Sequence, residues 1–301
     1  MNNNNKWTSE QMPDQSGKIV IVTGANSGIG YEAARALAIK GATVIMACRN
    51  LEKGQSAVNQ ISAEFSAAKI LLRQLDLADL SSVQQFAETF LAEFDRLDVL
   101  INNAGVMAIP YHQTVDGFEM QFGTNHLGHF KLTGLLFDLL KRTPNSRVVT
   151  LSSYAHFFGW INFKDLNGKR FYQKWLAYCQ SKLANILFGY ELQRRLAAIG
   201  NNPISIVVHP GWAATNLQHS TWFFRLLNPL LAQSQEIGAL PTLYAVTNPE
   251  VRGGEYIGPD GFLGQRGYPH KARSSRRSHD PETAKKLWQV SEEFTGIRFE
   301  I

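Results

Sequence analysis

Short apolar runs alternate with amphipathic segments along most of this chain of 301 residues. The runs are unbroken stretches of β-branched and aliphatic residues, which is typical of strands covered on both faces. Strands are expected at Lys18–Thr23, Thr43–Ala47, Ile70–Leu75, Val99–Asn102, Val148–Leu151 and Ile204–Val208. Helices are expected at Tyr31–Lys40, Leu51–Phe65, Ser81–Phe94, Phe118–Leu140 and Leu176–Ile199. This order predicts an α/β fold with a doubly wound parallel sheet and helices on both of its sides.

The composition predicts one main domain. A hydrophobic fraction of 44% and a charged fraction of 18% are ordinary for a globular protein with a sizeable core. No shift in composition interrupts residues 17–264, which we expect to form a single domain. The Asn-rich residues 1–16 are expected to be a disordered polar tail. Residues 265–301 are expected to be a C-terminal extension whose terminal helix starts near Asp280 and Pro281.

Charge, cysteine content and hydropathy exclude several classes of protein. The net charge of +5 is spread along the chain, so it does not indicate a nucleic-acid partner. The two cysteines, Cys48 and Cys179, cannot form a disulfide framework or a cysteine zinc site, and no other cluster suggests a metal. No apolar run approaches the ~18 residues of a membrane span, and the polar start does not resemble a signal peptide. We therefore expect a cytoplasmic protein without a transmembrane segment.

A glycine-rich turn joins the first expected strand to the first expected helix. It reads Thr23-Gly24-Ala25-Asn26-Ser27-Gly28-Ile29-Gly30. Gly24 allows a sharp turn, Gly28 lets the backbone approach a pyrophosphate, and Gly30 allows close packing of helix on strand. The start of the helix then offers amide donors and positive potential to phosphates. An ordinary β–α turn is the alternative, but the strand before it and the helix after it favour a dinucleotide site.

The end of the second strand bears on which dinucleotide binds. A site that prefers NAD usually has an acidic residue there, which accepts a hydrogen bond from the ribose 2′-hydroxyl. This chain has Cys48, Arg49 and Asn50 instead. The planar guanidinium of Arg49 can pair with a 2′-phosphate. The sequence therefore favours NADP(H) over NAD(H), although an arginine in this place can also be merely solvated.

Tyr178 and Lys182 indicate acid–base chemistry. They lie four positions apart, one turn of an expected helix, so both polar groups can project from the same face. A phenol titrates near pH ~10. A cation one turn away is expected to favour the phenolate and to lower that pKa toward the range of a working catalyst. Such a pair is frequent by chance, so its meaning depends on the glycine turn upstream.

With these motifs in order, the chain resembles the short-chain dehydrogenase/reductase family, and within it the retinol-dehydrogenase-like branch. The resemblance runs from about Gly17 to Gly264. The motifs that carry it are Thr23–Gly30, Asp76–Leu77, Asn102–Gly105, Asn125–Phe130, Ser152–Ser153, Tyr178–Lys182 and Pro210–Gly211. It implies a single-domain Rossmann fold, a nicotinamide cofactor and a small-molecule carbonyl or alcohol substrate. It also leaves open two oligomeric states: a homodimer, which in this family usually pairs the helices bearing Asn125 and Tyr178, and a monomer.

The resemblance implies a catalytic tetrad of Asn125, Ser153, Tyr178 and Lys182. In it Tyr178 exchanges the proton, Ser153 donates a hydrogen bond to the substrate oxygen, Lys182 binds the nicotinamide ribose, and Asn125 holds a relay water. The motifs of the resemblance, the glycine turn and Arg49 give one set of expected cofactor-binding residues. They are Gly24, Asn26, Ser27, Gly28, Ile29, Gly30, Arg49, Asn50, Asp76, Leu77, Asn103, Ala104, Gly105, Tyr178, Lys182, Pro210, Gly211 and Thr215.

Structural roles are the alternatives for several of these side chains. Ser153 can cap a turn, Asn125 can be a core amide and Asp76 can be a helix N-cap. His126 and His129 are interpreted as packing residues.

Two segments depart from the alternation of strands and helices. Between Ser153 and Tyr178 lie 24 residues, and this insertion is rich in aromatic side chains. The second segment, residues 216–234, contains Trp222-Phe223-Phe224 and is predicted to be a lid over the substrate. Both follow carboxyl ends of strands, where open α/β sheets bind ligands. Their aromatics predict a bulky, apolar substrate.

The leading hypothesis is an NADP(H)-dependent oxidoreductase that acts on a carbonyl/alcohol pair. The main alternative is a non-catalytic NADP(H)-sensing regulatory protein on the same fold, although such proteins typically lose the tyrosine or the lysine. A lipid-surface protein, based on Trp222–Leu227, is a third hypothesis. Light-dependent protochlorophyllide reductases share the Tyr-x-x-x-Lys framework, but nothing else in the sequence indicates their chemistry.

Overall fold

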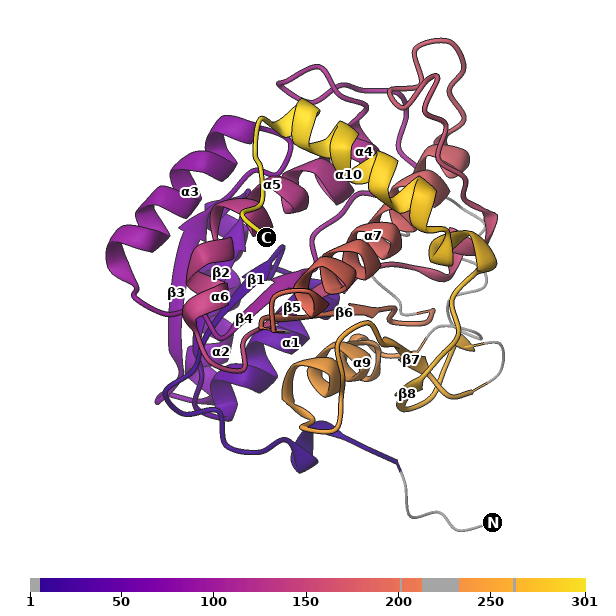
Figure 1. Cartoon of the computed structure of the whole chain (residues 1–301). Helices are drawn as coiled ribbons and strands as arrows, with labels where there is room; N and C mark the ends of the chain where they lie inside the picture. The colour runs from indigo at the N-terminus through magenta and orange to yellow at the C-terminus, as the bar shows by residue number, and fades with distance from the viewer. Residues whose placement is uncertain (1–5, 201, 213–232, 262–263) are drawn as a thin grey trace.

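The computed structural model describes residues 6–200, 202–212, 233–261 and 264–301. Within these residues, eight strands form one sheet in the order β3-β2-β1-β4-β5-β6-β7-β8 (Figure 1). All neighbours are parallel except β8, which runs antiparallel to β7. The strands are β1 (Ile19–Thr23), β2 (Thr43–Cys48), β3 (Lys69–Gln74), β4 (Val99–Asn102), β5 (Arg147–Leu151), β6 (Ile204–Val208), β7 (Tyr256–Pro259) and β8 (Pro269–Lys271).

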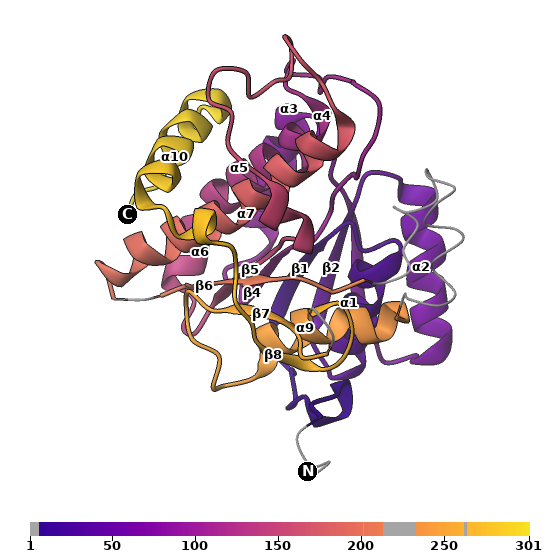
Figure 2. The same ribbon diagram turned by 90° about the vertical axis from the view of Figure 1, so that its right-hand side faces the viewer.

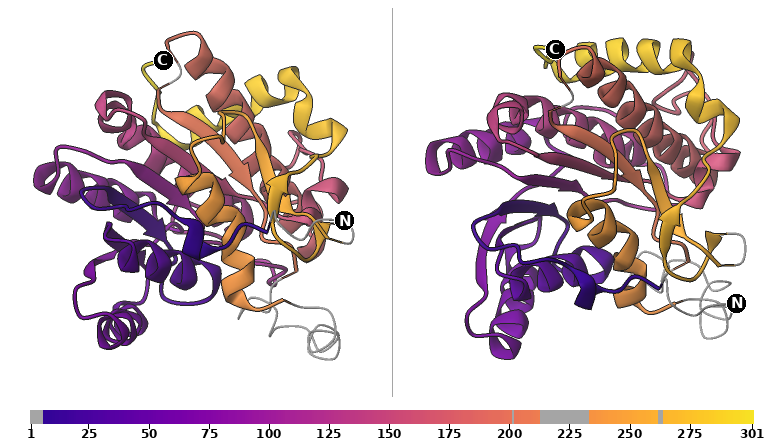
Figure 3. Two further views of the ribbon diagram at one scale, coloured as in Figure 1. Left: turned by 90° about the horizontal axis from the view of Figure 1, so that it is seen from below. Right: turned by 60° about the horizontal axis from the view of Figure 1, so that its bottom comes forward.

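Helices cover both faces of the sheet, as the alternation predicts (Figure 2). The helices on one face are α1 (Gly28–Ile39), α2 (Leu51–Glu64) and α9 (Gln235–Thr247), with α9 packed along α1 (Figure 3). The helices on the other face are α3 (Leu80–Glu93), α5 (Gly128–Leu135), α6 (Phe137–Arg142), α7 (Lys174–Ala197) and α10 (Pro281–Thr295). Each face buries its own layer of aliphatic and aromatic side chains against the strands, which confirms the doubly wound architecture.

The six expected strands are all present, with ends that differ by one residue. Strands β7 and β8 were not expected, because they are four and three residues long and each contains a proline. They continue the sheet past residue 264, so the predicted boundary there does not separate two structural units. Short edge strands of this kind leave almost no periodic signal in a sequence.

The prediction of a disordered tail is wrong for residues 6–16. This segment contains a short 3₁₀ helix, Ser9–Gln11. Met12 is buried in the core beneath the first face, and the ring of Trp7 meets Tyr244 of α9 edge-on at 5.3 Å. Polar contacts also hold the segment, since the amide of Gln15 donates to the carbonyl oxygen of Lys40 at 2.8 Å.

The helix expected at Phe118–Leu140 is broken into several pieces. A three-residue helix, α4 (Met120–Phe122), leads into a π-helical turn, Gly123–Leu127, which is followed by α5 and α6. The π turn is closed by the amide of Gly128, which donates to the carbonyl oxygen of Gly123. π turns of this kind occur frequently at functional sites. Here the turn carries Asn125, which is fully buried.

The C-terminal helix α10 packs across α7 and α5 (Figure 1). It begins after Asp280, whose carboxylate accepts from the amide of Glu282, with Pro281 in the first turn, as the sequence indicates. Trp288 is buried between the rings of Phe130 and Phe188, at centroid distances of 5.1 and 5.8 Å. The last residues of the chain continue this layer, since Phe299 lies 4.6 Å from Trp288.

Candidate active site

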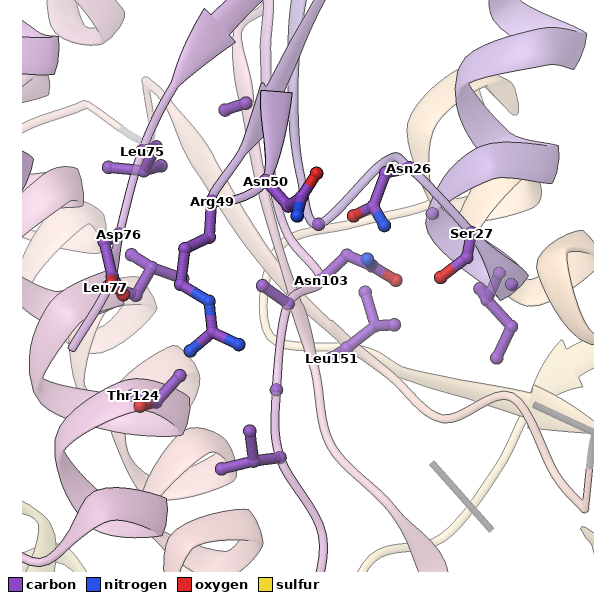
Figure 4. Close-up of a pocket in the computed structure, with 18 of the residues that line it drawn as sticks. Asn26, Ser27, Arg49, Asn50, Leu75, Asp76, Leu77, Asn103, Thr124 and Leu151 are labelled. Carbon is purple, nitrogen blue, oxygen red and sulfur yellow. The ribbon is translucent and has the colours of Figure 1, made fainter. Parts of the chain in front are cut away.

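A cleft of about 370 Å³ opens at the carboxyl ends of the central strands (Figure 4). This is where an open α/β sheet with a topological switch between β1 and β4 binds its ligand. Of the expected site residues, the cleft is lined by Gly24, Asn26, Ser27, Gly28, Ile29, Gly30, Arg49, Asn50, Asp76, Leu77, Asn103, Ala104, Gly105, Tyr178, Lys182 and Pro210. The structure thus brings the glycine turn and the Tyr/Lys pair into one cavity.

The glycine turn is held tightly against the segment after β4. Gly24 and Gly28 have φ of +67° and +63°, a region that only glycine adopts readily. A Cβ on Gly24 would lie 2.9 Å from the Cβ of Ala104, and one on Gly30 would collide with the amide of Asn103 and the carbonyl of Gly24. That Asn103 amide donates to the carbonyl oxygen of Thr23 at 2.7 Å. The side of the turn that faces Asn103 and Ala104 is therefore filled, and the phosphates of a ligand have room only on the side that lines the cleft.

Basic and amide side chains line the cleft beside β2. Arg49 extends from the end of β2 toward the Asp76–Leu77 segment (Figure 4). Asn50 caps α2 by accepting from the amide of Lys53 at 2.8 Å, and the side chain of Lys53 also lines the cleft. Cys48, where an acidic residue would favour NAD, is fully buried, and burial raises the pKa of its thiol to about 11.

Asp76 sits at the end of β3 and is not the N-cap of α3. Its Oδ1 accepts from the amide of Ala78 at 2.9 Å, and its own amide donates to Ser82 Oγ. Asp79 caps α3 instead, accepting from the amides of Ser81 and Ser82. The turn around Asp76 therefore holds its carboxylate at the rim of the cleft, where the neighbouring Leu77 is also exposed to the cavity.

Tyr178 and Lys182 lie next to each other on α7, deep in the cleft. The Lys182 Nζ lies 5.7 Å from the centre of the Tyr178 ring and 3.5 Å from the carbonyl oxygen of Leu151. Burial lowers the pKa of Lys182 to about 8. Burial also raises the pKa of Tyr178 to about 12, and a hydrogen bond with the Ser153 side chain opposes this rise. Ser153 thus sits against the phenol although it does not line the cleft itself.

The expected lowering of the Tyr178 pKa by Lys182 is wrong for the protein without its ligand. Burial removes water from both groups, and this disfavours the charged form of each. The cost outweighs the attraction between the Lys182 ammonium and a Tyr178 phenolate. Only the Ser153 hydrogen bond favours the phenolate to a marked extent. The phenol is therefore held in its protonated form, which is the form that donates a proton to a developing alkoxide.

Asn125 joins the segment beside the glycine turn to the helix that bears the Tyr/Lys pair. Its Oδ1 accepts from the amide of Val106 at 2.8 Å, and its Nδ2 donates to the Val106 carbonyl and to Ser181 Oγ, both at 2.9 Å. A Cβ on Gly105 would lie 3.0 Å from Asn125 Oδ1 and 3.4 Å from Lys182 Nζ. The Asn125 side chain is thus a satisfied buried amide, and it lies within a few ångströms of the lysine.

Some expected site residues lie outside the cleft or outside the described residues. Asn125, Ser153 and Gly211 do not line it, whereas Pro210 does. Thr215 and most of the expected lid, residues 216–232, lie outside the described residues. Gly211 has φ of +68°, and a Cβ there would lie 2.5 Å from the carbonyl oxygen of Gln265.

The structure adds cleft residues that the sequence analysis missed, namely Ala47, Lys53, Leu75, Val106, Thr124, Leu151 and Ser152. Ser152 donates to the carbonyl oxygen of Lys182 at 2.7 Å, so it fixes α7 against β5. A basic residue in the first turn of α2 was the available signal for Lys53. Thr124 comes from the π turn, which no helical periodicity reveals.

The aromatic insertion walls the cleft less than expected. Phe158, Trp160 and Phe171 are 65%, 47% and 71% exposed. Phe163 instead packs beneath α10, where the ammonium of Lys286 lies 4.5 Å from its ring centre. Tyr172 donates to the carbonyl oxygen of Ile109 at 2.8 Å and so ties the end of the insertion to the segment after β4.

Two other features bear on the class of protein. In the ranges described above, no three or more His, Cys, Asp or Glu side chains are grouped so as to hold a metal ion. Across those ranges, no helix combines the length and hydropathy that crossing a bilayer requires.

A mostly parallel sheet, a glycine turn at its switch point and a buried Tyr/Lys pair define a nicotinamide-dependent oxidoreductase of alcohol and carbonyl groups. The chain belongs to the short-chain dehydrogenase family, whose model matches residues 18–223, and to its retinol-dehydrogenase-like branch. Retinol dehydrogenase 12 of Bos taurus is 44% identical over 94% of this chain and 88% of its own length. Retinol dehydrogenase 11 of Homo sapiens is 45% identical over 93% of this chain and 86% of its own.

Solved structures agree with this assignment. An uncharacterised protein from Mycobacterium paratuberculosis superposes with a TM-score of 0.83 and 45% identity, covering 98% of this chain and 100% of its own. A short-chain dehydrogenase from Escherichia coli in complex with NADPH has a TM-score of 0.66 and 25% identity, covering 81% and 97% of the two chains.

Proposed function

We propose that this protein is an NADP(H)-dependent reductase or dehydrogenase of a bulky, apolar carbonyl/alcohol pair. Bound NADPH would supply a hydride to the carbonyl carbon. The observation that carries the proposal is that Tyr178 and Lys182 line the same cleft as the glycine turn and Arg49. A non-catalytic sensor could use Lys182 to bind the cofactor, but it needs no buried phenol beside that ammonium, and burying the phenol costs free energy.

The preference for NADP(H) rests on charge beside β2. Arg49 and Lys53 line the cleft there, and the position that would carry an acid in a NAD site is the buried thiol of Cys48. Two cations, with no carboxylate at the end of β2 itself, attract a 2′-phosphate and leave a 2′-hydroxyl without its usual acceptor there. The NADP and NADPH complexes of the short-chain dehydrogenases from Shigella flexneri and Escherichia coli support the same cofactor here.

The proposed proton chemistry uses four residues. Tyr178 donates its proton to the oxygen that becomes the alcohol, and Ser153, whose side chain favours the phenolate of Tyr178, donates to the same oxygen. Lys182 would hold the ribose of a bound nicotinamide cofactor, and its positive charge would favour the phenolate that remains after Tyr178 has given up its proton. Asn125 keeps Lys182 and the segment at Gly105–Val106 in place.

The substrate class is proposed from the aromatic side chains and from the relatives. The retinol dehydrogenases to which the chain is similar are named for a long apolar alcohol. Trp175 lies edge-on to Tyr178 at 6.4 Å, and Tyr154 packs on Phe157 at 4.8 Å beside Ser153. These rings lie close to Tyr178 and Ser153 without lining the cleft, and they suit an apolar substrate; most of the lid predicted at residues 216–234 lies outside the described residues.

Two further expectations remain predictions. A cytoplasmic location rests on the two reduced cysteines and is tested by fractionation. A homodimer remains a prediction too, but α10 already covers the face of α5 and α7 within the same chain, so a dimer would need another surface. Size-exclusion chromatography with light scattering measures its mass.

The test of the proposed function is a panel of aldehydes, ketones, retinal and steroid ketones, read as loss of nicotinamide absorbance. We expect turnover of an apolar carbonyl with NADPH and much slower turnover with NADH. Tyr178→Phe should abolish turnover while NADPH still binds with nearly the original Kd. Full turnover by that variant, or NADPH binding without turnover of any member of the panel, would contradict the proposal.

A further inference from the structure

His129 lies between the end of β1 and the π turn that carries Asn125, and it does not line the cleft. It is the second histidine of the Asn125–Phe130 motif, and it is buried in α5. Its Nδ1 lies 3.0 Å from the carbonyl oxygen of Asn125, and its Nε2 lies 2.9 Å from Oγ1 of Thr23. It therefore contacts both the π turn and the last residue of β1, directly before the glycine turn.

These two contacts fix the tautomer of the imidazole. A carbonyl oxygen can only accept, so Nδ1 carries the hydrogen and donates it to Asn125. Burial, with a smaller contribution from the nearby charge of Lys182, lowers the pKa of His129 to about 4 although the hydrogen bond with the Asn125 carbonyl acts in the opposite direction, so the ring is neutral near pH 7. Nε2 is then an acceptor, and the hydroxyl of Thr23 donates to it.

Thr23 passes this arrangement on to the segment after β4. With its proton directed to His129, Thr23 Oγ1 offers its lone pairs to the amides of Asn103 and Ala104, at 2.9 and 3.0 Å. The carbonyl oxygen of Ile101 is a second, longer acceptor for the Thr23 hydroxyl at 3.3 Å. One imidazole thus connects the π turn, the strand before the glycine turn and the segment that passes beside the expected nicotinamide.

The other end of this chain of hydrogen bonds reaches α7. Asn125 donates through its side chain to Ser181, the residue before Lys182, and Ser181 in turn donates to the carbonyl oxygen of Tyr178 at 2.8 Å. A shift of the Asn125 backbone is therefore transmitted to both members of the Tyr/Lys pair. Displacements of about 1 Å at a reacting centre can cost roughly a hundredfold in rate.

We propose that His129 is a positioning residue for the reaction, which as its Nδ1–H tautomer keeps the Tyr/Lys pair in register with the glycine turn. This inference rests on the proposed function, because His129 can position Tyr178 and Lys182 for a reaction only if these two residues take part in one. Its action passes through Asn125 on one side and Thr23 on the other, and His129 itself touches neither substrate nor cofactor.

His126 provides a matched control three residues earlier. It is as deeply buried, but its Nε2 bonds with Ser291 Oγ of α10 at 2.8 Å, away from the cleft. Leucine is close to histidine in volume, so His126→Leu and His129→Leu both delete one buried imidazole. A merely structural role predicts that both variants lose stability and keep kcat. The proposal predicts that only His129→Leu loses kcat, at saturating NADPH and substrate, by tenfold or more.

Conservative variants separate the two hydrogen bonds of His129 and cover the case in which His129→Leu does not fold. His129→Asn keeps a donor for the Asn125 carbonyl, and His129→Gln keeps an acceptor within reach of Thr23. We expect each to recover part of the kcat lost in His129→Leu. Thr23→Val, combined with His129→Leu, should cost less than the product of the single effects, since both changes break one chain of bonds.

The experiment measures kcat, KM, melting temperature and NADPH Kd for the wild type, Tyr178→Phe and these variants. Inactive wild type or active Tyr178→Phe refutes the proposed function. Active wild type, inactive Tyr178→Phe and unchanged kcat in His129→Leu refute the positioning role alone. The ¹⁵N shifts of the His129 ring report the tautomer without any substrate, and an Nε2–H form overturns the proposal whatever the kinetics show.

Discussion

Lys182→Met should make this protein more stable and inactive. In the folded protein the buried ammonium has a pKa of about 8, against an ordinary value of 10.5. That difference corresponds to about 3 kcal/mol by which the charged lysine disfavours folding at pH 7. Methionine has a similar length and no charge to desolvate. The change leaves no orphaned acceptor, because the Leu151 carbonyl that Lys182 contacts also accepts from Asn185 Nδ2 at 2.9 Å.

The pH dependence of this gain is its signature. The folded state binds fewer protons at Lys182 than the unfolded state between pH 8 and 10.5. The penalty in the wild type is therefore complete below pH 8, fades as the pH rises toward 10.5, and is absent well above pH 10.5, where both states are neutral. The advantage of Lys182→Met should be about 3 kcal/mol at pH 7 and about 1 kcal/mol at pH 10.

The assay is urea unfolding of the ligand-free protein at both pH values, with thermal unfolding in parallel. For a chain of this size the gain at pH 7 corresponds to a rise in Tm of about 5 °C. Lys169→Met, at an exposed site, is the control and should change neither quantity. A variant no more stable than the wild type at pH 7, or a gain that does not shrink toward pH 10, would refute this reasoning about burial.

Three further predictions follow from the site and its supports. Arg49→Ala should raise the KM for NADPH roughly ten- to a hundredfold and leave that for NADH unchanged, as expected for loss of a charge-assisted bond to phosphate; equal effects on both cofactors would argue against a 2′-phosphate contact. Gly105→Ala should lower kcat roughly tenfold with little change in Tm, because its Cβ would press on Asn125 and Lys182; unchanged kcat would show that this contact relaxes freely. Trp288→Ala should cost about 3–5 kcal/mol in urea unfolding, as for other large buried rings; a loss below 1 kcal/mol would mean that α10 contributes little to the fold.

The parts of the fold that form from segments with a single, consistent hydrophobic pattern were predictable. Strands β1 to β6 are continuous apolar runs, and α2, α3 and α7 have clear helical periodicity with recognisable caps, so their positions were predicted to within a few residues. The glycine turn was predictable because positive φ at Gly24 and Gly28 and the close approach at Gly30 permit almost no other residue. These features depend on local chemistry that the sequence states directly.

The parts set by tertiary contact were not predictable. The π turn at Asn125 interrupts a segment that reads as one helix, and it exists because buried partners such as Val106 and Ser181 hold its side chain. The direction of the Tyr178 pKa was missed because spacing along a helix reveals a neighbouring charge but not the removal of water around it. His129 was interpreted as packing, since nothing in the sequence shows that Thr23 lies across from it.

The layer formed by α10 and the last residues of the chain has a consequence for how the enzyme matures on the ribosome. Everything needed for the nucleotide cleft is synthesised well before residue 280, yet the outer side of α7 stays uncovered until Trp288 and Phe299 emerge. A nascent or truncated molecule would therefore expose the apolar rings of Phe130 and Phe188, and exposed apolar surface of this kind promotes aggregation. The side of α7 that faces away from the cleft is therefore covered only after the residues that line the cleft have been made.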